Sequence, residues 1–259
     1  MGRRGRGVCL ALLLGLLPLA GVAAERLKVC FEGEDVRPWR NKDGSGLNFE
    51  LLNRVAKRSG IVFDYVPTPW RRCFTEMKKG LVAGVLGGSF KAERTAYGAY
   101  PGGNPADARR SVYTDHYVLV RRMGEPVGWD GQRITQLVGP VAIQNGYSVG
   151  DDLKAMGVAI DDGARSAADN LHKLRSGRVS AMAALAGEMA SLLAGDPSLR
   201  EKIEILPRPL VEKPYYLMLS HQLLQSRPEL AERIWANIEA VRQSKEYQKI
   251  EAQALDRQP

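Results

Sequence analysis

The stretch GVLGGSFKAERTAYGAYP, from Gly84 to Pro101, decides how the rest of the chain is interpreted. It begins as a short, apolar, glycine-rich run, which predicts a strand that opens into a loop. Ser89 then offers a hydroxyl, and Arg94 follows with a planar guanidinium whose donors match a carboxylate. The pattern predicts an anion-binding loop. The alternative is a surface loop whose arginine forms a weak, solvated ion pair.

Outward from this stretch, the sequence alternates between predicted strands and helices. Residues 27–31 and 61–66 are apolar runs typical of strands, and residues 47–60 repeat apolar side chains at helical spacing before a glycine. The alternation recurs between residues 116 and 205. Residues 207–214 predict a linker before a further strand. This order predicts an α/β fold with a mostly parallel sheet and two similar lobes.

The first residues predict a signal peptide. Arg3, Arg4 and Arg6 precede a strongly apolar run, and Val22 and Ala24 fit the small-residue rule for cleavage after residue 24. The apolar run is too short to span a bilayer comfortably. We therefore expect export to the periplasm.

The chain is basic, with a formal net charge of +8. Such a balance suits an acidic ligand or an anionic surface, although it also serves solubility alone. An exported chain without a long run of Lys and Arg is not expected to bind nucleic acid.

Two cysteines follow the predicted signal peptide, Cys30 in a predicted strand and Cys73 in the first turn of a predicted helix. In an oxidising compartment they predict one disulfide. The competing interpretation is two buried thiols that pack as small apolar groups.

Motifs that carry catalysis or bind metals are not found in the sequence. It has no G-x-S-x-G and no C-x-x-C, and its histidines lack metal-ligand spacing. No catalytic residue, metal or cofactor is therefore expected. Binding has better support: Trp70 follows a predicted strand, where its ring would either cover a ligand or anchor the next helix in the core.

Taken in order, GLNFELLNRVAKRSGIVFDYVPTPW, the glycine-rich strand, the serine and the Glu-Arg pair resemble the periplasmic solute-binding proteins of amino-acid ABC transporters, family 3. The resemblance implies a type II-like fold of two α/β lobes, joined by two crossover strands, with the ligand in the cleft. It implies lobe 1 at residues 25–118 and 209–259, lobe 2 at residues 119–208, and hinges near residues 116–122 and 206–214.

The resemblance also implies site residues in the first lobe. Arg94 matches the arginine that grips the ligand α-carboxylate, and Ser89 matches a hydroxyl in the same carboxylate site. Gly87 matches a nearby backbone contact. Trp70 matches the position whose aromatic or apolar side chain covers the ligand.

Further site residues are implied on the other side of the cleft and near the ligand's amino group. AIQNGYS resembles the family's strand and glycine turn, which puts Ser148, with Tyr147 beside it, at a helix N-terminus facing the carboxylate. Glu32 falls where many members have an acidic residue near the ligand's amino group.

The chain departs from the family pattern in the second lobe. Leu185 stands where the family usually has an aspartate that pairs with the ligand ammonium, and Ser180 replaces an earlier aspartate. A buried ammonium needs a partner, so an α-amino group on the ligand is in doubt. Glu188 is one candidate substitute. The preferred interpretation is that Glu188 is a solvated carboxylate at the start of a helix.

The resemblance implies a monomeric binding protein that delivers a small carboxylate-bearing, amino-acid-like solute to an ABC transporter permease. One alternative is a dehydratase-like enzyme on the same fold. The other is a ligand-sensing protein that reports to a receptor.

Overall fold

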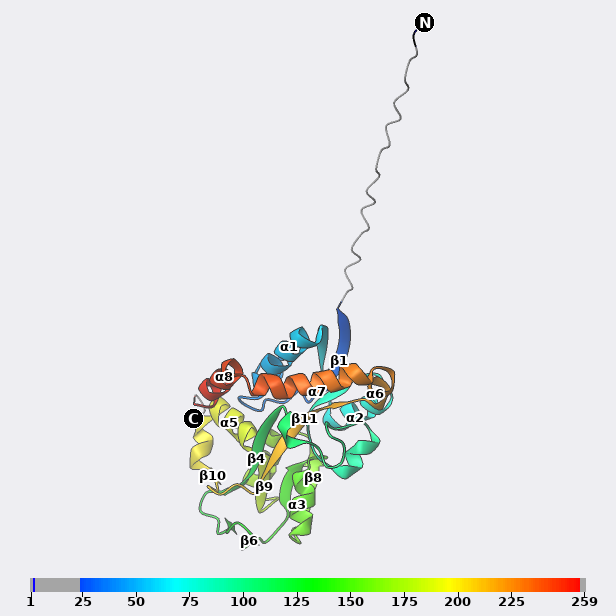
Figure 1. The fold of residues 1–259 in the computed structure, drawn as a ribbon. Helices are drawn as coiled ribbons and strands as arrows, with labels where there is room; N and C mark the ends of the chain where they lie inside the picture. The colour runs from blue at the N-terminus through cyan, green and yellow to red at the C-terminus, as the bar shows by residue number, and fades with distance from the viewer. Residues whose placement is uncertain (1, 3–23, 257–259) are drawn as a thin grey trace.

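The computed structural model describes residue 2 and residues 24–256. The predicted signal peptide therefore lies almost wholly outside the described residues. The described residues form two α/β lobes that share one sheet (Figure 1). Within the described part, no helix has the length and apolar character needed to cross a membrane.

The described residues form one large sheet, one small hairpin and a set of covering helices. The large sheet has nine strands in the order β2-β1-β3-β11-β4-β9-β7-β8, with β10 paired to β4. Its strands are β1 (Glu25–Phe31), β2 (Ile61–Pro67), β3 (Gly84–Ser89), β4 (Tyr113–Arg122), β7 (Val141–Gln144), β8 (Ile160–Ala164), β9 (Ala181–Leu185), β10 (Ile203–Ile205) and β11 (Val211–Leu219). The hairpin pairs β5 (Gly128–Trp129) with β6 (Ile134–Thr135).

The helices cover the faces of the sheet. They are α1 (Leu47–Ser59), α2 (Trp70–Lys78), α3 (Val149–Ala155), α4 (Ala167–Arg175), α5 (Ala186–Gly195), α6 (His221–Ser226), α7 (Pro228–Arg242) and α8 (Lys245–Leu255). Short 3₁₀ helices lie at η1 (Ala92–Ala96), η2 (Ala108–Arg110) and η3 (Pro197–Glu201).

The first lobe is built on β1, which pairs in parallel with β2 on one side and β3 on the other. Helix α1 connects β1 to β2 and ends at Gly60, whose left-handed conformation (φ 71°) lets its N–H reach the carbonyl of Ala56. The C-terminal helix α7 returns to this lobe and packs beside α1 (Figure 1).

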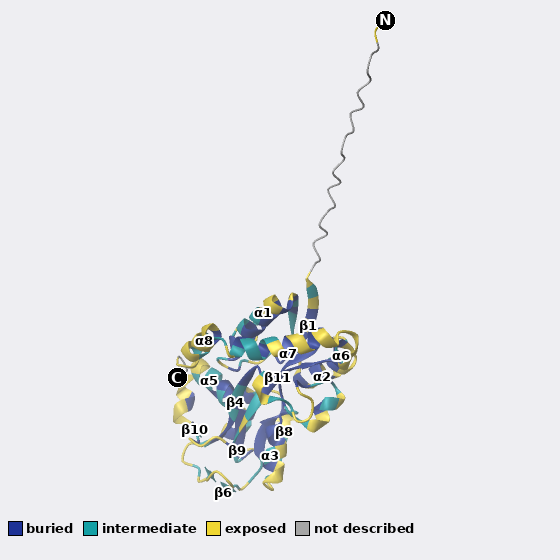
Figure 2. Cartoon of the chain, in the orientation of Figure 1, coloured by how far each residue is buried: buried dark blue, intermediate teal, exposed yellow. Residues whose placement is uncertain are grey.

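The second lobe repeats the arrangement, with β7 between β8 and β9 in parallel. Alternate residues of β9 belong to different apolar clusters: Ala183 and Leu185 to one, Met182 and Ala184 to the other. Successive side chains of a strand point to opposite faces, so both faces of this part of the sheet are buried. Figure 2 shows the central strands as buried and the outer helix faces as exposed.

Strands β4 and β11 cross between the lobes. The end of β11 pairs with β3 and its beginning pairs with β4, which in turn pairs with β9. This arrangement confirms the predicted two-lobed α/β fold with two crossover strands. The predicted linker at residues 207–214 is wrong in part, because β11 begins at Val211. Pro214 lies opposite Thr114 in that ladder; a proline removes only one ladder donor, so the pairing outweighs the local turn signal.

Candidate functional site

Arg94 lies at the end of the first lobe's glycine-rich segment. Strand β3 ends at Ser89, and Arg94 lies in the 3₁₀ helix η1 directly after it. Nη1 of Arg94 donates to the Ser89 carbonyl (2.7 Å) and to the Ser89 hydroxyl (3.2 Å). Arg94 is only 5% exposed. It is therefore a buried, held guanidinium, and the surface-loop alternative is wrong.

The second lobe meets this group at the turn before α3. Nη2 of Arg94 donates to the carbonyl of Gly146 (2.9 Å), and the Ser89 hydroxyl donates to the Ser148 hydroxyl (2.8 Å). Ser148 immediately precedes α3 and is buried. The anion-binding groups predicted from separate stretches of sequence thus lie together between the lobes.

Trp70 has the core role considered for it, and its ring also faces Arg94. It begins α2, is buried and packs edge-on against Phe74, as a core residue does. Its ring also lies 5.5 Å from the Arg94 guanidinium carbon and 6.4 Å from the ring of Tyr147. A cation over an aromatic face is stabilised by the ring's quadrupole, so Trp70 supports the position of Arg94.

Gly87 places the backbone of β3 close to a second arginine, Arg40. Its φ of 88° is a left-handed conformation that side chains rarely adopt. A Cβ atom at this position would lie 3.2 Å from Nη1 of Arg40 and 3.5 Å from the hydroxyl of Tyr113. Sequence reasoning missed Arg40, because no local pattern marks it.

Glu32 is buried beside Arg40. Nη2 of Arg40 donates to Oε2 of Glu32 (3.1 Å), and the Tyr147 hydroxyl donates to the same oxygen (2.5 Å). Burial raises the pKa of Glu32 to about 7, against the opposing influence of Arg40 and Tyr147. The carboxyl at the position expected near a ligand's amino group is therefore already paired within the protein.

The preferred interpretation of Glu188 as a solvated carboxylate is wrong. Glu188 is 2% exposed; its Oε1 accepts from Gln144 (2.5 Å) and lies 2.9 Å from the Tyr147 hydroxyl. Its Oε2 accepts from the backbone N–H of Leu185 (3.1 Å), which caps α5. Burial raises the pKa of Glu188. The helix-cap pattern was readable from sequence, but the fold packs this helix start under Tyr147 and away from solvent.

One cavity gathers all seven predicted ligand-binding residues. It is lined by Glu32, Arg40, Trp70, Gly87, Ser89, Arg94, Tyr117, Tyr147, Ser148, Leu185 and Tyr215. Side chains nearly fill it, leaving a free volume of about 10 Å³, room for about one water molecule. Sequence reasoning missed Tyr117 and Tyr215, because which face of β4 and β11 meets the cleft depends on strand register.

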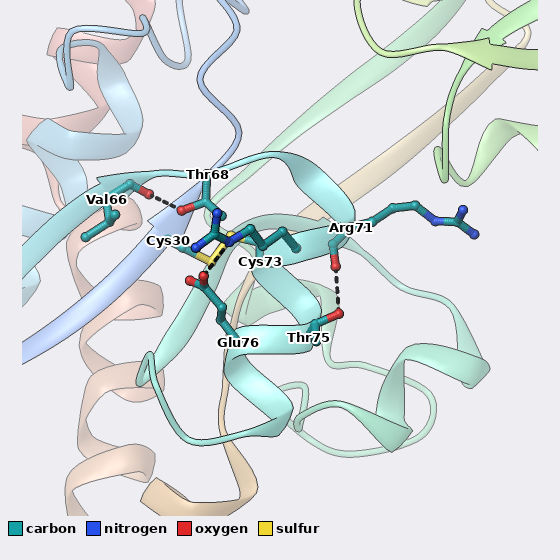
Figure 3. Close-up of a disulfide and its surroundings, with 8 residues drawn as sticks. Cys30, Val66, Thr68, Arg71, Cys73, Thr75 and Glu76 are labelled. Atoms are coloured by element: carbon teal, nitrogen blue, oxygen red, sulfur yellow. Dashed lines mark hydrogen bonds and ion pairs between the residues drawn. A yellow bond between two sulfur atoms is a disulfide. The ribbon is translucent and has the colours of Figure 1, made fainter.

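Cys30 and Cys73 form a disulfide that joins β1 to α2, with Cα atoms 5.9 Å apart (Figure 3). Both residues are fully buried. The bond holds the helix that begins with Trp70 against the sheet. Among residues 24–256, no cluster of three or more His, Cys, Asp and Glu side chains is placed to hold a metal ion.

No protein-family profile and no curated protein sequence matches this chain. Solved structures do. An ancestral arginine-binding protein bound to glutamine is 18% identical, with a TM-score of 0.70 over 90% of this chain and 98% of that one. The substrate binding protein of an amino acid ABC transporter is 17% identical, with a TM-score of 0.66 over 90% and 100%.

An ancestral amino acid-binding protein, a precursor of cyclohexadienyl dehydratase, is 18% identical, with a TM-score of 0.66 over 88% of this chain and 95% of that one. At such identities the likeness establishes the fold, that of the two-lobed periplasmic binding proteins.

Proposed function

We propose that this protein binds a small carboxylate-bearing, amino-acid-like solute between its lobes and delivers it to an ABC transporter. The observation that carries the proposal is the buried cluster of Arg94, Ser89 and Ser148, which joins both lobes within hydrogen-bond distance. A guanidinium and two hydroxyls in a site shielded from water are suited to a carboxylate. Fold neighbours that bind amino acids support the same conclusion.

The other predicted residues have matching roles in this proposal. Trp70 and Tyr147 cover the ligand from either lobe, and the open backbone at Gly87 lets it approach β3. Glu32 faces the ligand from the side of Arg40. The network of side chains fixes these groups before the ligand arrives, which lowers the entropy lost on binding.

Ligand entry requires the lobes to separate. We propose that they are residues 25–118 with 209–259 and residues 119–208, and that they rotate about β4 and β11 near residues 116–122 and 206–214. Hinge closure around a ligand uses a few residues in such connecting segments. The predicted signal peptide supports a periplasmic location. In this proposal the protein is a monomer that visits a permease.

A thermal-shift screen of amino acids, polyamines and organic acids tests the proposal. A ligand that binds only the folded state raises the melting temperature in a concentration-dependent way. Hits are then titrated by calorimetry against the wild type and against Arg94→Ala, with Arg54→Ala as a control far from the cavity. If no carboxylate-bearing compound shifts the melting temperature, the proposal fails.

A second candidate, a dehydratase-like enzyme, is favoured by Glu32. A buried carboxyl with a pKa of about 7 is suited to general acid–base work at neutral pH. NMR of a bound ligand over hours distinguishes the two functions. An unchanged ligand identifies a binding protein, whereas conversion that Glu32→Gln abolishes without loss of binding identifies an enzyme.

A further inference from the structure

A second buried arginine lines the cavity, and the proposed carboxylate site does not use it. Arg40 is 2% exposed and donates to Oε2 of Glu32 (3.1 Å) and to the carbonyl of Glu34 (3.3 Å). Its Nη1 makes no hydrogen bond to the described residues and lies on the side of Gly87, where a Cβ would be 3.2 Å away. Arg40 therefore presents free donors to the same cavity as Arg94.

The single proton of the Tyr147 hydroxyl can serve only one of its two neighbouring carboxyls. The Tyr147 hydroxyl lies 2.5 Å from Oε2 of Glu32 and 2.9 Å from Oε1 of Glu188. A tyrosine hydroxyl carries one proton and donates to one oxygen only. The other contact is a hydrogen bond only if that carboxyl is protonated. Burial also raises the pKa of both carboxyls. When one of them is protonated, the two arginines of the cavity outweigh the remaining carboxylate by one positive charge.

The cavity also contains a hydrogen-bond donor with no partner in the part of the chain that the structure describes. Nε1 of Trp70 is buried and has no hydrogen-bond partner among the described residues. The buried hydroxyl of Tyr215 lies close to the hydroxyl of Tyr117 and has no acceptor within 3.5 Å among the described residues. Leu185 also lines the cavity, and its apolar side chain offers no acceptor to a ligand ammonium. An unpaired donor in a buried site costs free energy unless the ligand supplies an acceptor.

We propose that the ligand carries two acidic groups and that it binds without needing an ammonium. One acidic group lies on Arg94, Ser89 and Ser148. The other lies on Arg40 and takes a hydrogen bond from Tyr215. The substrate class is thus small dicarboxylic acids and their close analogues. This inference rests on the proposed function and specifies its substrate.

The mouth of the cleft suits the approach of such an acid. A groove of about 660 Å³ adjoins the cavity, sharing Glu32 and Trp70 with it, and is lined by Arg71, Arg72 and Arg165. Glu34 is the only other acidic side chain of its lining. Arg72 is paired with Glu76, so Arg71 and Arg165 are the arginines that would attract an anion here. Positive charge along a cleft raises the local concentration of anions and their association rate.

Calorimetric titration with a matched series of compounds tests the substrate class. Succinate, glutarate and adipate carry two carboxylates and no ammonium, L-glutamate carries both, and L-glutamine carries one carboxylate and an ammonium. We expect at least one of the diacids to bind about 100-fold more tightly than L-glutamine, because the latter leaves Arg40 without an anion. Equal or tighter binding of L-glutamine overturns the inference and leaves the proposed function intact. Failure of the whole series, together with a failed carboxylate screen, overturns both.

Arg40→Met locates the second acidic group. It removes the charge at similar length, and we expect diacid affinity to fall about 100-fold while affinity for L-glutamine stays within about 3-fold of the wild type. Arg54→Met, which removes an arginine paired with Glu50 outside the cavity, should bind as the wild type does. An unchanged diacid affinity in folded Arg40→Met overturns the assignment of Arg40. If the variant does not fold, the wild-type series alone decides.

Discussion

The hydroxyl of Ser89 donates a hydrogen bond to the hydroxyl of Ser148, with the two oxygens 2.8 Å apart. Ser89 ends β3 of the first lobe, and Ser148 immediately precedes α3 of the second. Arg94 makes the same connection through the carbonyl of Gly146. The closed contact between the lobes is therefore made by the groups proposed to hold a carboxylate, which couples closure to binding.

Closure should be visible in solution. We expect small-angle scattering of the wild type to show a smaller radius of gyration with a saturating ligand than without it, because the ligand's carboxylate links Ser89 and Ser148 across the cleft. Ser148→Trp is the matched variant. Ser148 is 1% exposed, so an indole at this position should hold the lobes apart and abolish the change. An unchanged wild-type radius at saturation contradicts closure.

The disulfide should form on export and stabilise the first lobe. Mass spectrometry of non-reduced protein should find Cys30 linked to Cys73, as their Cα separation of 5.9 Å permits. Cys73→Ser should lower the free energy of unfolding by about 2–4 kcal/mol, since the bond restricts the unfolded chain. The double variant Cys30→Ser/Cys73→Ser should lower the free energy of unfolding little further, because the first substitution already removes the bond. Two free thiols in the exported wild type would show that the bond is absent in solution.

The sequence predicted most of the fold because the signals were local. Helix α1 has apolar residues at helical spacing and Gly60 at its end, and β9 is an unbroken apolar run, as a strand buried on both faces requires. The start of β11 could not be predicted in this way. Pro214 and its charged neighbours resemble a linker locally, and only pairing with β4, far away in sequence, makes the segment a strand.

Gly87→Ala should weaken binding by moving Arg40. The left-handed φ of 88° strains any side chain, and the new Cβ would meet Nη1 of Arg40 at 3.2 Å. We expect a loss of about 1 kcal/mol in the free energy of unfolding and a clear loss of ligand affinity. Gly60→Ala, at a φ of 71° with open space around it, is the control for strain alone and should leave affinity unchanged. Equal affinity losses in both variants would argue against a role for Gly87 in positioning Arg40.

Asp115 should make stability fall as pH rises. It lies on the crossover strand β4, and burial raises the pKa of its carboxyl from 3.8 to about 7. Because the pKa is higher in the folded than in the unfolded state, the protonated carboxyl contributes its full share to the free energy of unfolding below pH 3.8. This contribution is lost progressively as the pH rises to about 7. Asp115→Asn should remove this dependence, so its stability relative to the wild type should increase by about 2 kcal/mol between pH 5 and pH 8.

Urea unfolding at several pH values measures this difference. Asp107→Asn is the control, because Arg109 lowers the pKa of Asp107 to about 2. That carboxyl is ionised in both the folded and the unfolded chain between pH 5 and pH 8. The free energy of unfolding of Asp107→Asn should therefore differ from that of the wild type by a constant amount over this range. A constant difference for Asp115→Asn as well would mean that the Asp115 carboxyl is ionised in the folded protein at neutral pH.

Part of the candidate site could be predicted, because its residues lie in a recognisable local sequence pattern. Ser89 ends a glycine-rich strand and Arg94 follows five residues later. This pattern was compatible with an anion-binding loop and with a solvated surface arginine, and the family resemblance favoured the first. Arg40 and Glu188 were not predictable, because their roles depend on which segments the fold packs around them. Arg40 follows an aromatic residue in a loop, and Glu188 has the sequence pattern of an ordinary helix cap. Burial and contact with Tyr147 make Glu188 part of the site's network.

Arg94 should be the residue on which binding depends most. Its guanidinium is 5% exposed and faces the cavity between the lobes, so Arg94→Ala would leave a desolvated ligand carboxylate short of its main partner. We expect a loss of about 2–5 kcal/mol in binding free energy. Arg94→Lys should restore only part of it, because an ammonium lacks the two-pronged donor geometry of arginine. The free energy of unfolding should fall as well, because the Gly146 carbonyl loses its partner, while the hydroxyl of Tyr100 keeps the Ser89 carbonyl paired (2.7 Å). Calorimetric titration of the three proteins, with urea unfolding in parallel, measures both quantities. Wild-type affinity in Arg94→Ala would place the carboxylate elsewhere in the cleft.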